Sequence, residues 1–388
     1  MPAVAIALIT NYLTPYRVPL YERLAHSHGL EVLCYGGGGR YVPSWFADLD
    51  RQLETASFPA RRIHGARAAF AAPGCYEAVI APFAGGAILP AAYAGARVRQ
   101  VPFVLWASVW AQPWSLTHAA ALPVTRHIHR HADAVVAYGE HVRRFVALIR
   151  GHDEDVFIAP QAVEPELFAR EVGAEEQSEF RSAHGLGSAR LVLYVGRLVE
   201  EKGVAVLLEA WPRVRAEATL VVVGDGPLAA RARATKGVRL VEPLPRPSLA
   251  AAYATAEATV LASVPTPRFR EPWGLVCNES MDQGRPVIAS DGVGAVAGGL
   301  VRDGETGLVV PAGDAEALAA VIDRLLGDRG LAERLGAAAR TAVAPYTYDA
   351  MAEGFGQALV TARSRTAPRG RAVRRPRRPP SSGSARRH

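Results

Sequence analysis

The sequence predicts an α/β protein with two doubly wound parallel sheets, one in each half of the chain. Short, continuously apolar and β-branched runs recur along the chain, and segments of helical length separate them. A strand that is apolar along its whole length is covered on both faces, which is typical of parallel sheets. Strand–helix alternation predicts right-handed crossovers. At 388 residues the chain is also too long for one ordinary core.

Six apolar runs fall in each half, and these are the predicted strands. They cover residues 4–9, 30–35, 78–83, 101–106, 133–138 and 155–160, then 191–195, 219–223, 238–241, 258–262, 286–290 and 307–310. The implied units are an N-terminal domain over residues 1–170, a C-terminal domain over residues 188–345 and a return helix over residues 346–361. The polar segment 170–190 is expected to be a linker with a short helix. The expected architecture is two Rossmann-like domains that face a cleft.

The positive charge is concentrated at the C-terminal end of the chain. The formal net charge is +7, but residues 362–388 hold ten arginines and no acid, so residues 1–361 carry 34 basic and 37 acidic side chains. This tail lacks aromatic residues and apolar periodicity, so we expect it to be disordered. An anionic membrane surface is a candidate partner for its arginines, and no specific nucleic acid is expected. A solvated extension without a partner is the plainer interpretation.

The N-terminal sequence and the cysteines favour a cytoplasmic protein. The first apolar run ends at Thr10, far short of the ~20 residues of a membrane span, and no basic segment precedes it as in a signal peptide. Cys34, Cys75 and Cys277 are an odd and scattered set, which does not suggest a disulfide framework. The basic tail would allow a peripheral position at the inner face of a membrane.

Ligands of parallel sheets bind beyond the carboxyl ends of the strands, so the predicted site is the cleft between the two domains. No glycine follows the first strand until Gly29, so the G-x-G-x-x-G pattern of nicotinamide and flavin cofactors is missing there. Instead Pro15, Tyr16 and Arg17 open an amphipathic helix. Arg17 is a candidate for facing the cleft, and a surface cation or a helix-cap contact is the alternative.

Two cations follow the strand predicted at residues 191–195. Gly196 allows a sharp turn at the strand end, and Arg197 and Lys202 flank a loop that leads into a helix. Such a transition offers free amides and the positive end of a helix dipole, which suits an anion. The chain has 42 arginines but only two lysines, Lys202 and Lys236, so a lysine retained here is notable. We interpret the two cations as a diphosphate site; for Arg197 an ordinary salt bridge is the alternative.

Two acids, Glu271 and Glu279, stand eight residues apart in an otherwise apolar run. A helix is expected from about Leu275 to Gln283, so Glu279 lies one turn inside it and Glu271 precedes it. Eight helical residues span ~12 Å, which matches a sugar and a ribose separated by a diphosphate. Carboxylates only accept hydrogen bonds and therefore suit hydroxyl-rich ligands. Two partly exposed acids around a helix start are the alternative.

Three segments in this order resemble the C-terminal domain of retaining glycosyltransferase family 4, which has the GT-B fold: "YVGRLVEEKG", "VVVGDGP" and "EPWGLVCNESMDQGRPVIAS". The resemblance is strongest over residues 188–345. In the first half, "NYLTPYRVPLYERL" and "ADAVVAYGEHVRRF" resemble a branch that builds surface polysaccharides or lipid-linked sugars. The resemblance implies a sugar transfer from a nucleotide-diphospho-sugar to a glycan or lipid-linked acceptor.

The resemblance also implies roles for individual residues. Glu271 would bind the donor sugar and act in catalysis with Arg197 and Lys202, while Glu279 would bind the ribose. The remaining donor-binding candidates are Gly274, Leu275, Gly196 and Glu242, and the acceptor-side candidates are Arg17, Tyr16 and His118. Many relatives have a glycine- and histidine-bearing loop after the strand at 101–106, where the nearest histidine here is His118, and "PNGVD" where this chain has "PQAVE" at residues 160–164.

No cofactor and no metal are expected. No Asp-x-Asp occurs within the predicted donor-binding domain, residues 188–345, so a divalent cation clamping the diphosphate is not predicted. His127, His129 and His131 are interpreted as a solvated basic helix, with metal binding or a membrane-facing role as alternatives. Two other functions stay open: a non-catalytic GT-B partner subunit with a basic tail that binds membrane or nucleic acid, and a sugar-nucleotide epimerase.

Overall fold

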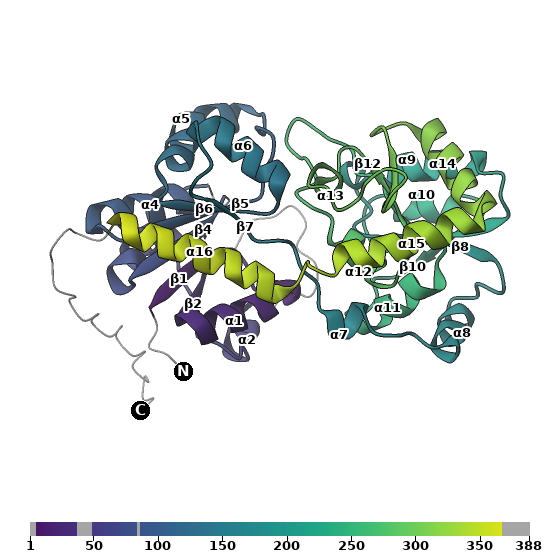
Figure 1. Ribbon diagram of the computed structural model, residues 1–388, viewed down its shortest axis with the longest axis horizontal. Helices are drawn as coiled ribbons and strands as arrows, with labels where there is room; N and C mark the ends of the chain where they lie inside the picture. Colours follow the sequence, from purple (N-terminus) through teal and green to yellow (C-terminus); the bar gives the residue numbers. More distant parts are fainter. Residues whose placement is uncertain (1–4, 37–48, 84–85, 367–388) are drawn as a thin grey trace.

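The computed structural model describes residues 5–36, 49–83 and 86–366. Two α/β domains lie next to each other along the long axis of the molecule, and each is built on a parallel sheet (Figure 1). The predicted fold class is therefore confirmed. In each sheet the strand order reverses beside the first strand of the domain, which is where open α/β sheets bind ligands.

The N-terminal sheet has the order β3-β2-β1-β4-β5-β6-β7 in the described residues. Its third strand was not predicted, because Ala60–Arg62 is short, polar and partly exposed at the edge of the sheet. The other strands agree with the apolar runs because they are covered on both faces. The strands are β1 (Ile6–Thr10), β2 (Leu30–Cys34), β3 (Ala60–Arg62), β4 (Ala78–Pro82), β5 (Phe103–Ala107), β6 (Ala134–Ala137) and β7 (Val156–Ile158).

The C-terminal sheet has the order β10-β9-β8-β11-β12-β13 among the described residues, and all its pairs are parallel. Each strand corresponds to one predicted apolar run. The strands are β8 (Arg190–Val195), β9 (Ala218–Val223), β10 (Val238–Val241), β11 (Ala258–Leu261), β12 (Val287–Ser290) and β13 (Gly307–Val310).

Helices cover both faces of the N-terminal sheet. One face packs on α1 and on the last helix of the chain, and the other face packs on α3, α4 and the ends of α5 and α6. The helices before the crossing between the domains are α1 (Val18–His28), α2 (Leu49–Glu54), α3 (Gly65–Ala71), α4 (Ile88–Arg99), α5 (Leu116–His131) and α6 (Glu140–Arg150), with 3-10 turns η1 (Pro15–Arg17) and η3 (Ala72–Cys75).

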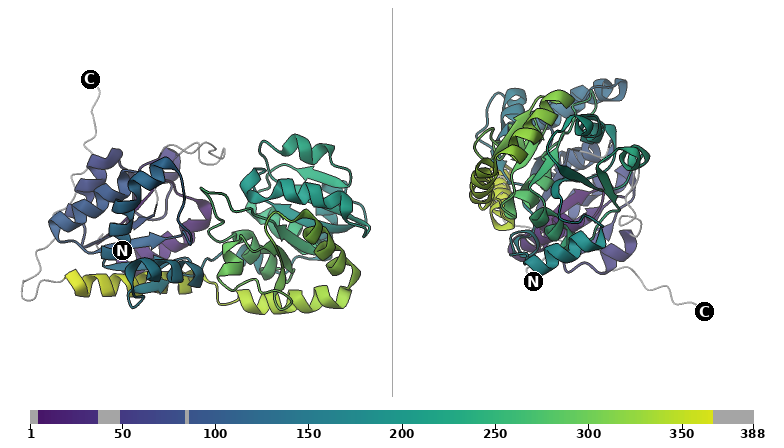
Figure 2. Two further views of the ribbon diagram at one scale, coloured as in Figure 1. Left: turned by 90° about the horizontal axis from the view of Figure 1, so that it is seen from above. Right: turned by 90° about the vertical axis from the view of Figure 1, so that its right-hand side faces the viewer.

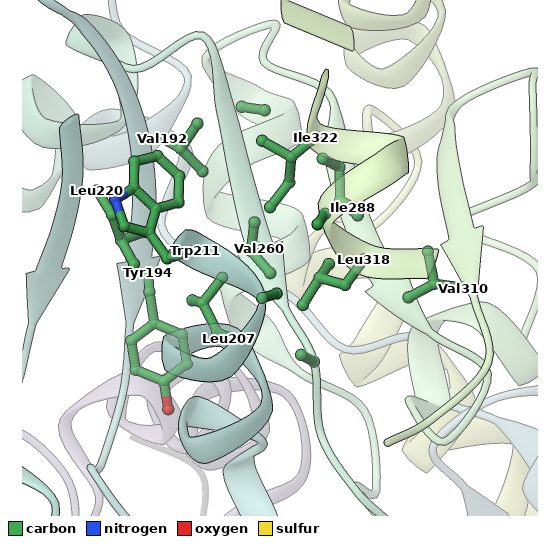
Figure 3. Packing of buried hydrophobic residues seen from close by; sticks show 14 of the residues in the cluster. Val192, Tyr194, Leu207, Trp211, Leu220, Val260, Ile288, Val310, Leu318 and Ile322 are labelled. Atoms are coloured by element: carbon green, nitrogen blue, oxygen red, sulfur yellow. The ribbon is translucent and has the colours of Figure 1, made fainter. Parts of the chain in front are cut away.

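The C-terminal sheet is covered in the same way. Successive residues of β8 point to opposite faces: Val192 and Tyr194 pack toward α9 and α14 (Figure 3), and Leu191 and Leu193 pack toward α11. The elements are α7 (Pro165–Phe168), α8 (Ala174–Ala183), η4 (Glu200–Lys202), α9 (Val204–Ala210), η5 (Trp211–Arg213), α10 (Ala229–Ala234), α11 (Arg246–Thr255), α12 (Leu275–Asp282), α13 (Gly294–Ala297), α14 (Ala315–Gly327) and α15 (Arg329–Val343).

The chain crosses between the domains earlier than predicted. Ala162 belongs to the N-terminal core, and Val163, the next residue, belongs to the C-terminal core. The predicted short helix is present as α8, but the segment 170–190 is not a linker, because α8 buries Phe180 in the C-terminal core and packs on α11. The prediction was wrong because the exposed glutamates of α8 hide a single buried side, so its average composition resembles that of a linker.

The last described helix, α16 (Tyr348–Thr366), returns to the N-terminal domain and buries Met351, Phe355 and Leu359 against its sheet. Together α15 and α16 run along one side of both domains (Figure 2). The predicted return helix is present but is longer than residues 346–361.

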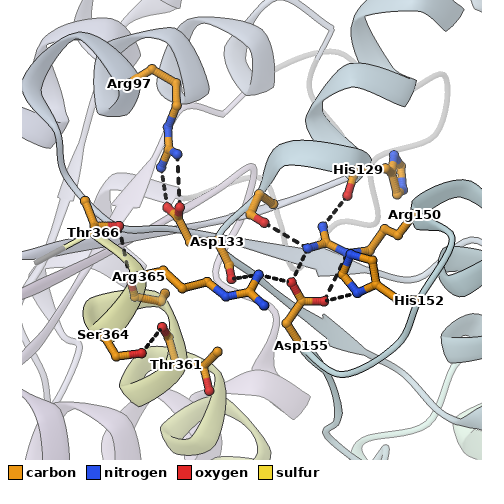
Figure 4. Close-up of polar contacts among 12 residues, drawn as sticks. Arg97, His129, Asp133, Arg150, His152, Asp155, Thr361, Ser364, Arg365 and Thr366 are labelled. Atoms are coloured by element: carbon orange, nitrogen blue, oxygen red, sulfur yellow. Dashed lines mark hydrogen bonds and ion pairs between the residues drawn. The ribbon is translucent and has the colours of Figure 1, made fainter.

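The start of the predicted disordered tail is helical, which corrects its expected boundary. Arg363 pairs with Glu77 at 3.1 Å, and Arg365 pairs with Asp155, a fully buried acid that also binds Arg150 (Figure 4). These contacts fix the end of α16 on the N-terminal domain. The rest of the tail, residues 367–388, lies outside the described residues.

Candidate functional site

The two neighbouring strands at the centre of the C-terminal sheet bring a cation and an acid together. Lys202 follows β8 and Ser263 follows β11, and both contact Glu271. The Lys202 Nζ lies 2.5 Å from Glu271 Oε2, and the Ser263 hydroxyl donates to the same oxygen at 3.0 Å. Both charged side chains are largely buried, with 20% and 6% of their surface exposed. The structure thus joins two of the three predicted catalytic side chains.

The position of Lys202 depends on the glycine that follows it. Gly203 has φ +70°, and a Cβ atom there would lie 1.6 Å from the carbonyl oxygen of Ala262 at the end of β11. Only glycine allows so close an approach in this conformation. The turn that carries Lys202 therefore presses against the strand end that carries Ser263.

Arg197 is not part of this contact. Its side chain is 39% exposed and lies 3.8 Å from Glu201, while its carbonyl accepts a hydrogen bond from Tyr194 at 2.9 Å. A surface ion pair of this kind contributes little to stability. Arg197, next to Gly196 at the end of β8, is consequently free to exchange Glu201 for another anion.

The helix α12 begins four residues after Glu271, at Leu275. Gly274 has φ +96°, and a Cβ atom there would lie 2.5 Å from the side chain of Leu261 in β11. A glycine is required for the helix to start so close to the sheet. The first-turn amides of a helix lack intrahelical partners and attract anions. Gly274 and Leu275 therefore lie where the sequence predicted them, at a helix start beside the buried acid.

Glu279 lies inside α12 and is 8% exposed. Its Oε2 accepts a hydrogen bond of 2.6 Å from the Tyr253 hydroxyl of α11. Burial raises the pKa of Glu279, and the Tyr253 hydrogen bond and the charge of Arg246 only partly oppose this shift. The guanidinium of Arg246 is itself bound to Glu164.

The side chain of Glu242 is not near this group. It is 74% exposed after β10 and pairs with Arg233 at 3.2 Å. Among the described contacts, the Glu242 side chain therefore does not join the group around Glu271.

Two side chains of the N-terminal domain donate to the loop that carries Glu271, and neither was among the predicted site residues. The Trp110 Nε1 donates to the carbonyl oxygen of Glu271 at 3.0 Å, and the His141 Nε2 donates to that of Pro272 at 2.9 Å. Burial lowers the pKa of His141. A signal for His141 was present, because it follows β6 and Gly139 at a carboxyl strand end.

The acceptor-side candidates have other partners. Arg17 is only 5% exposed, so it is not a surface cation; it binds Gln161 and faces three aromatic rings. The Tyr16 carbonyl accepts from Tyr348 at 2.7 Å. His118 lies in the first turn of α5, where its ring and its amide both contact Ser115. Among the described contacts, none of the three reaches the C-terminal domain.

A cavity of about 120 Å³ lies between residues 109–113 of the N-terminal domain and residues 266–270 and Pro272 of the C-terminal domain, and Glu271 is not part of its lining. In the same boundary Arg270 stacks on Trp110 at 5.0 Å. A larger groove of about 910 Å³, between α1 and α16, includes none of the predicted site residues.

The search for metal and membrane features covers the described ranges only. There, no group of three or more His, Cys, Asp or Glu side chains is arranged to hold a metal ion. His127 and His131 stack on each other in α5 with ring centres 4.2 Å apart. No helix within these ranges is long and apolar enough to cross a membrane.

Comparison with known proteins agrees with this geometry. Residues 189–328 match the family described as "Glycosyl transferases group 1". The chain is 33% identical over 234 residues to a D-inositol 3-phosphate glycosyltransferase of Thermomonospora curvata, covering 54% of this chain and 52% of the relative. It is 29% identical over 243 residues to a GDP-mannose-dependent alpha-(1-6)-phosphatidylinositol monomannoside mannosyltransferase of Mycolicibacterium smegmatis, covering 58% and 61%.

The structure of Anabaena Alr3699/HepE in complex with UDP and glucose superposes with a TM-score of 0.75 at 17% identity, covering 92% of this chain and 100% of that chain. The two parallel-sheet domains therefore form a GT-B fold. The C-terminal domain is a glycosyl transferases group 1 domain, which confirms the resemblance found in the sequence. The chain spans about half the length of the curated relatives it matches.

Proposed function

We propose that this protein is a retaining glycosyltransferase that moves a sugar from a nucleotide-diphospho-sugar to a glycan or lipid-linked acceptor without a metal. The observation that carries the proposal is the Lys202–Glu271 pair of 2.5 Å, buried beside the start of α12 at the carboxyl ends of β8 and β11. Relatives named as glycosyltransferases and a structural neighbour solved with UDP support it.

The cations would stabilise the leaving group. Negative charge builds on the diphosphate as the bond to the anomeric carbon breaks. Lys202, Arg197 and the first amides of α12 lie at the carboxyl ends of the strands, so they could stabilise this charge once Lys202 exchanges Glu271 and Arg197 exchanges Glu201 for the phosphates. The diphosphate itself would then take the proton of the acceptor hydroxyl, which requires no separate base.

The two acids would bind the two ends of the donor. Glu271 accepts hydrogen bonds from sugar hydroxyls and orients the sugar for attack from the leaving-group side, which retains the anomeric configuration. Glu279 accepts from the ribose hydroxyls. Closure of the two domains would exclude water and limit donor hydrolysis.

A binding screen and three variants test this function. Thermal shift against UDP-, GDP-, ADP- and dTDP-sugars should identify one stabilising donor. With that donor, Lys202→Ala and Arg197→Ala should each lower turnover by roughly 10²-fold, as expected when an oriented charge contact is lost. Lys236, the only other lysine, is exposed after α10, so Lys236→Ala is the matched control and should keep full activity.

Near-normal turnover in both cation variants would remove the diphosphate assignment. Incubation with donor alone separates the alternatives: an epimerase converts the sugar, whereas a transferase hydrolyses it slowly or leaves it unchanged. A non-catalytic partner subunit would show neither reaction with any donor and acceptor. Turnover that survives removal of divalent cations by a chelator supports metal independence, and its loss contradicts it.

The surface of α5 supports a peripheral membrane position and a lipid-linked acceptor. Trp114, Leu116 and Val124 are 66%, 83% and 46% exposed. No acid occurs in α5, and its C-terminal half carries four exposed basic or titratable side chains, namely Arg126, His127, Arg130 and His131, beside the buried His129. Exposed apolar residues followed by cations are typical of helices that lie in an anionic membrane surface. The Trp114 amide donates to the carbonyl of Pro267 at 2.6 Å, so this surface begins beside the Glu271 loop.

Flotation with phosphatidylcholine vesicles, with and without phosphatidylglycerol, tests the membrane proposal. The double variant Trp114→Ser and Leu116→Ser should bind anionic vesicles at least tenfold more weakly, because it removes the inserted apolar surface. Val98→Ser, a change of a 72% exposed valine in α4, is the control. A variant with glutamine in place of the eight arginines after Thr366 measures separately how much the tail contributes to vesicle binding. Equal binding by the double variant and the native protein would contradict a role for α5.

A further inference from the structure

Four buried side chains form a continuous hydrogen-bonded chain from the N-terminal domain to the donor motif. Arg17 donates to the side-chain oxygen of Gln161. The main-chain oxygen of Gln161 accepts from Asn278 Nδ2 at 2.8 Å, and Asn278 Oδ1 accepts from Trp273 Nε1 at 2.7 Å. Each of these side chains belongs to a residue that is at most 5% exposed. We call these four residues the interdomain chain.

The C-terminal end of the interdomain chain consists of sequence neighbours of the two acids of the proposed donor site. Trp273 follows Glu271 by two residues, and Asn278 directly precedes Glu279. Gln161 lies in the segment where the backbone crosses between the domains, one residue before Ala162 of the N-terminal core. One set of hydrogen bonds therefore links the crossing to both sides of the α12 start.

Arg17 anchors the interdomain chain in the N-terminal domain. Its guanidinium faces the rings of Tyr16, Trp106 and Tyr138 at 5.0–5.3 Å, and no carboxylate binds it among the described contacts. A buried cation without an acid is costly, so the aromatic faces and the amide oxygen of Gln161 must hold it. Arg17 is consequently occupied by internal contacts.

We propose that Gln161 and Asn278 are positioning residues that fix the N-terminal domain relative to Glu271 and Glu279. Their buried donors and acceptors lose their partners if the domains shift around the crossing, and each unpaired group costs free energy. The expected effect on turnover rests on the proposed function, whereas the fixed position of one domain relative to the other does not.

This role separates turnover from nucleotide binding. The N-terminal domain would hold the acceptor, and the C-terminal domain alone holds the proposed nucleotide contacts. A misplacement of about 1 Å between reacting groups can lower a rate by 10²-fold. Loss of the interdomain chain should therefore lower kcat and leave the Kd of the nucleotide unchanged.

Double electron–electron resonance on the full chain measures the geometric part. Spin labels at Val98→Cys and Arg329→Cys, on exposed sites of the two domains, report the distance between them; Cys75→Ser removes the half-buried native thiol. Asn278→Leu keeps the size of the side chain but removes the donor to the Gln161 carbonyl, which is the bond that joins the domains, so its distance distribution should broaden or shift. Gln161→Met keeps that carbonyl and breaks only the bond to Arg17, so its change should be smaller, and Gln161→Glu keeps an acceptor for Arg17 and should keep the native distribution.

The same variants test the consequence for turnover. Asn278→Leu should turn over the donor found by the screen at least tenfold more slowly, with an unchanged calorimetric Kd for UDP or GDP, and Gln161→Glu should keep most of the native rate. If Asn278→Leu does not fold, Asn278→Asp, which keeps the acceptor for Trp273 but not the donor to Gln161, serves in its place. A native distance distribution in a folded Asn278 variant would overturn the proposal. Absence of turnover in the native protein would instead overturn the proposed function and leave the distance measurement valid.

Discussion

The surroundings of Glu271 and Glu279 differ in charge, although both acids are buried and belong to the same motif. Glu271 lies against the Lys202 ammonium group and a serine hydroxyl at the boundary between the domains. Glu279 lies within the C-terminal domain and contacts the neutral hydroxyl of Tyr253. One acid therefore has a cation as its partner, while burial raises the pKa of the other. The two acids on either side of the α12 start therefore have different electrostatic surroundings, which suits two different roles.

Glu271→Gln should have the largest effect on turnover. If it instead lowered nucleotide affinity, as a change at Glu279 should, the two acids would not have different roles. Turnover should fall by about 10²-fold because the sugar loses an oriented acceptor. The calorimetric affinity for UDP or GDP should not fall, because Lys202 is released from its carboxylate and becomes available to the diphosphate. A parallel loss of turnover and nucleotide affinity would show that Glu271 does not act on the sugar side.

Glu279→Gln should act mainly on nucleotide affinity. Hydrogen bonds to charged groups contribute about 1.5–3 kcal/mol, so the Kd should rise by at least tenfold. The amide keeps the shape of the side chain and can still accept from Tyr253. Calorimetry that gives the native Kd would exclude the ribose role.

Tyr253→Phe tests the surroundings of Glu279 while leaving its carboxylate in place, so its effect on nucleotide affinity should be smaller. It removes the hydroxyl that binds Glu279 and leaves a buried carboxylate oxygen without that donor, so unfolding in urea should show a loss of about 1–3 kcal/mol. Nucleotide affinity should change only a few-fold, since the carboxylate remains. As a control, Tyr76→Phe changes a buried tyrosine that binds a carboxylate in the N-terminal domain, and it should leave nucleotide affinity unaltered.

His141→Gln should have the smallest effect, and only at low pH. Burial lowers the pKa of His141, so below about pH 6.5 the unfolded chain takes up a proton before the folded one, and stability falls as the pH falls. Glutamine keeps a donor for the Pro272 carbonyl but does not titrate. Urea unfolding at pH 7.5 and 5.5 should show a smaller acid loss in the variant, by at most about 1.4 kcal/mol per pH unit. An identical loss of stability between pH 7.5 and 5.5 in the variant and the native protein would exclude a contribution of His141 to the acid sensitivity.

Most of the fold was predictable because nearly every strand is a continuous apolar run that can be recognised in the sequence alone. Runs such as the one around Leu191 are apolar along their whole length, and the structure covers them on both faces. The edge strand at Ala60–Arg62 has no such signal, since its side chains are partly exposed. The position of α8 was equally hidden, because one buried phenylalanine decides which domain the helix joins.

The candidate site was predictable only where local sequence determines it. Lys202, Gly274 and Glu271 were predicted in the segments between a strand and the helix that follows it, and the structure places them there. The contacts of Trp110 and His141 depend on how the two domains meet, which no local pattern encodes. The same reason explains Arg17: its position at a helix start was correct, but its partner Gln161 comes from a segment 144 residues away.

The return of α16 to the first sheet has a consequence for how the protein is made. During synthesis the N-terminal domain emerges from the ribosome before the C-terminal domain, yet its hydrophobic core lacks Met351, Phe355 and Leu359 until the end of α16 has emerged. Domains generally fold as units in order of synthesis. In this protein the C-terminal domain can complete its packing first. One face of the N-terminal sheet stays partly exposed until α16, which is translated after the C-terminal domain, packs on it.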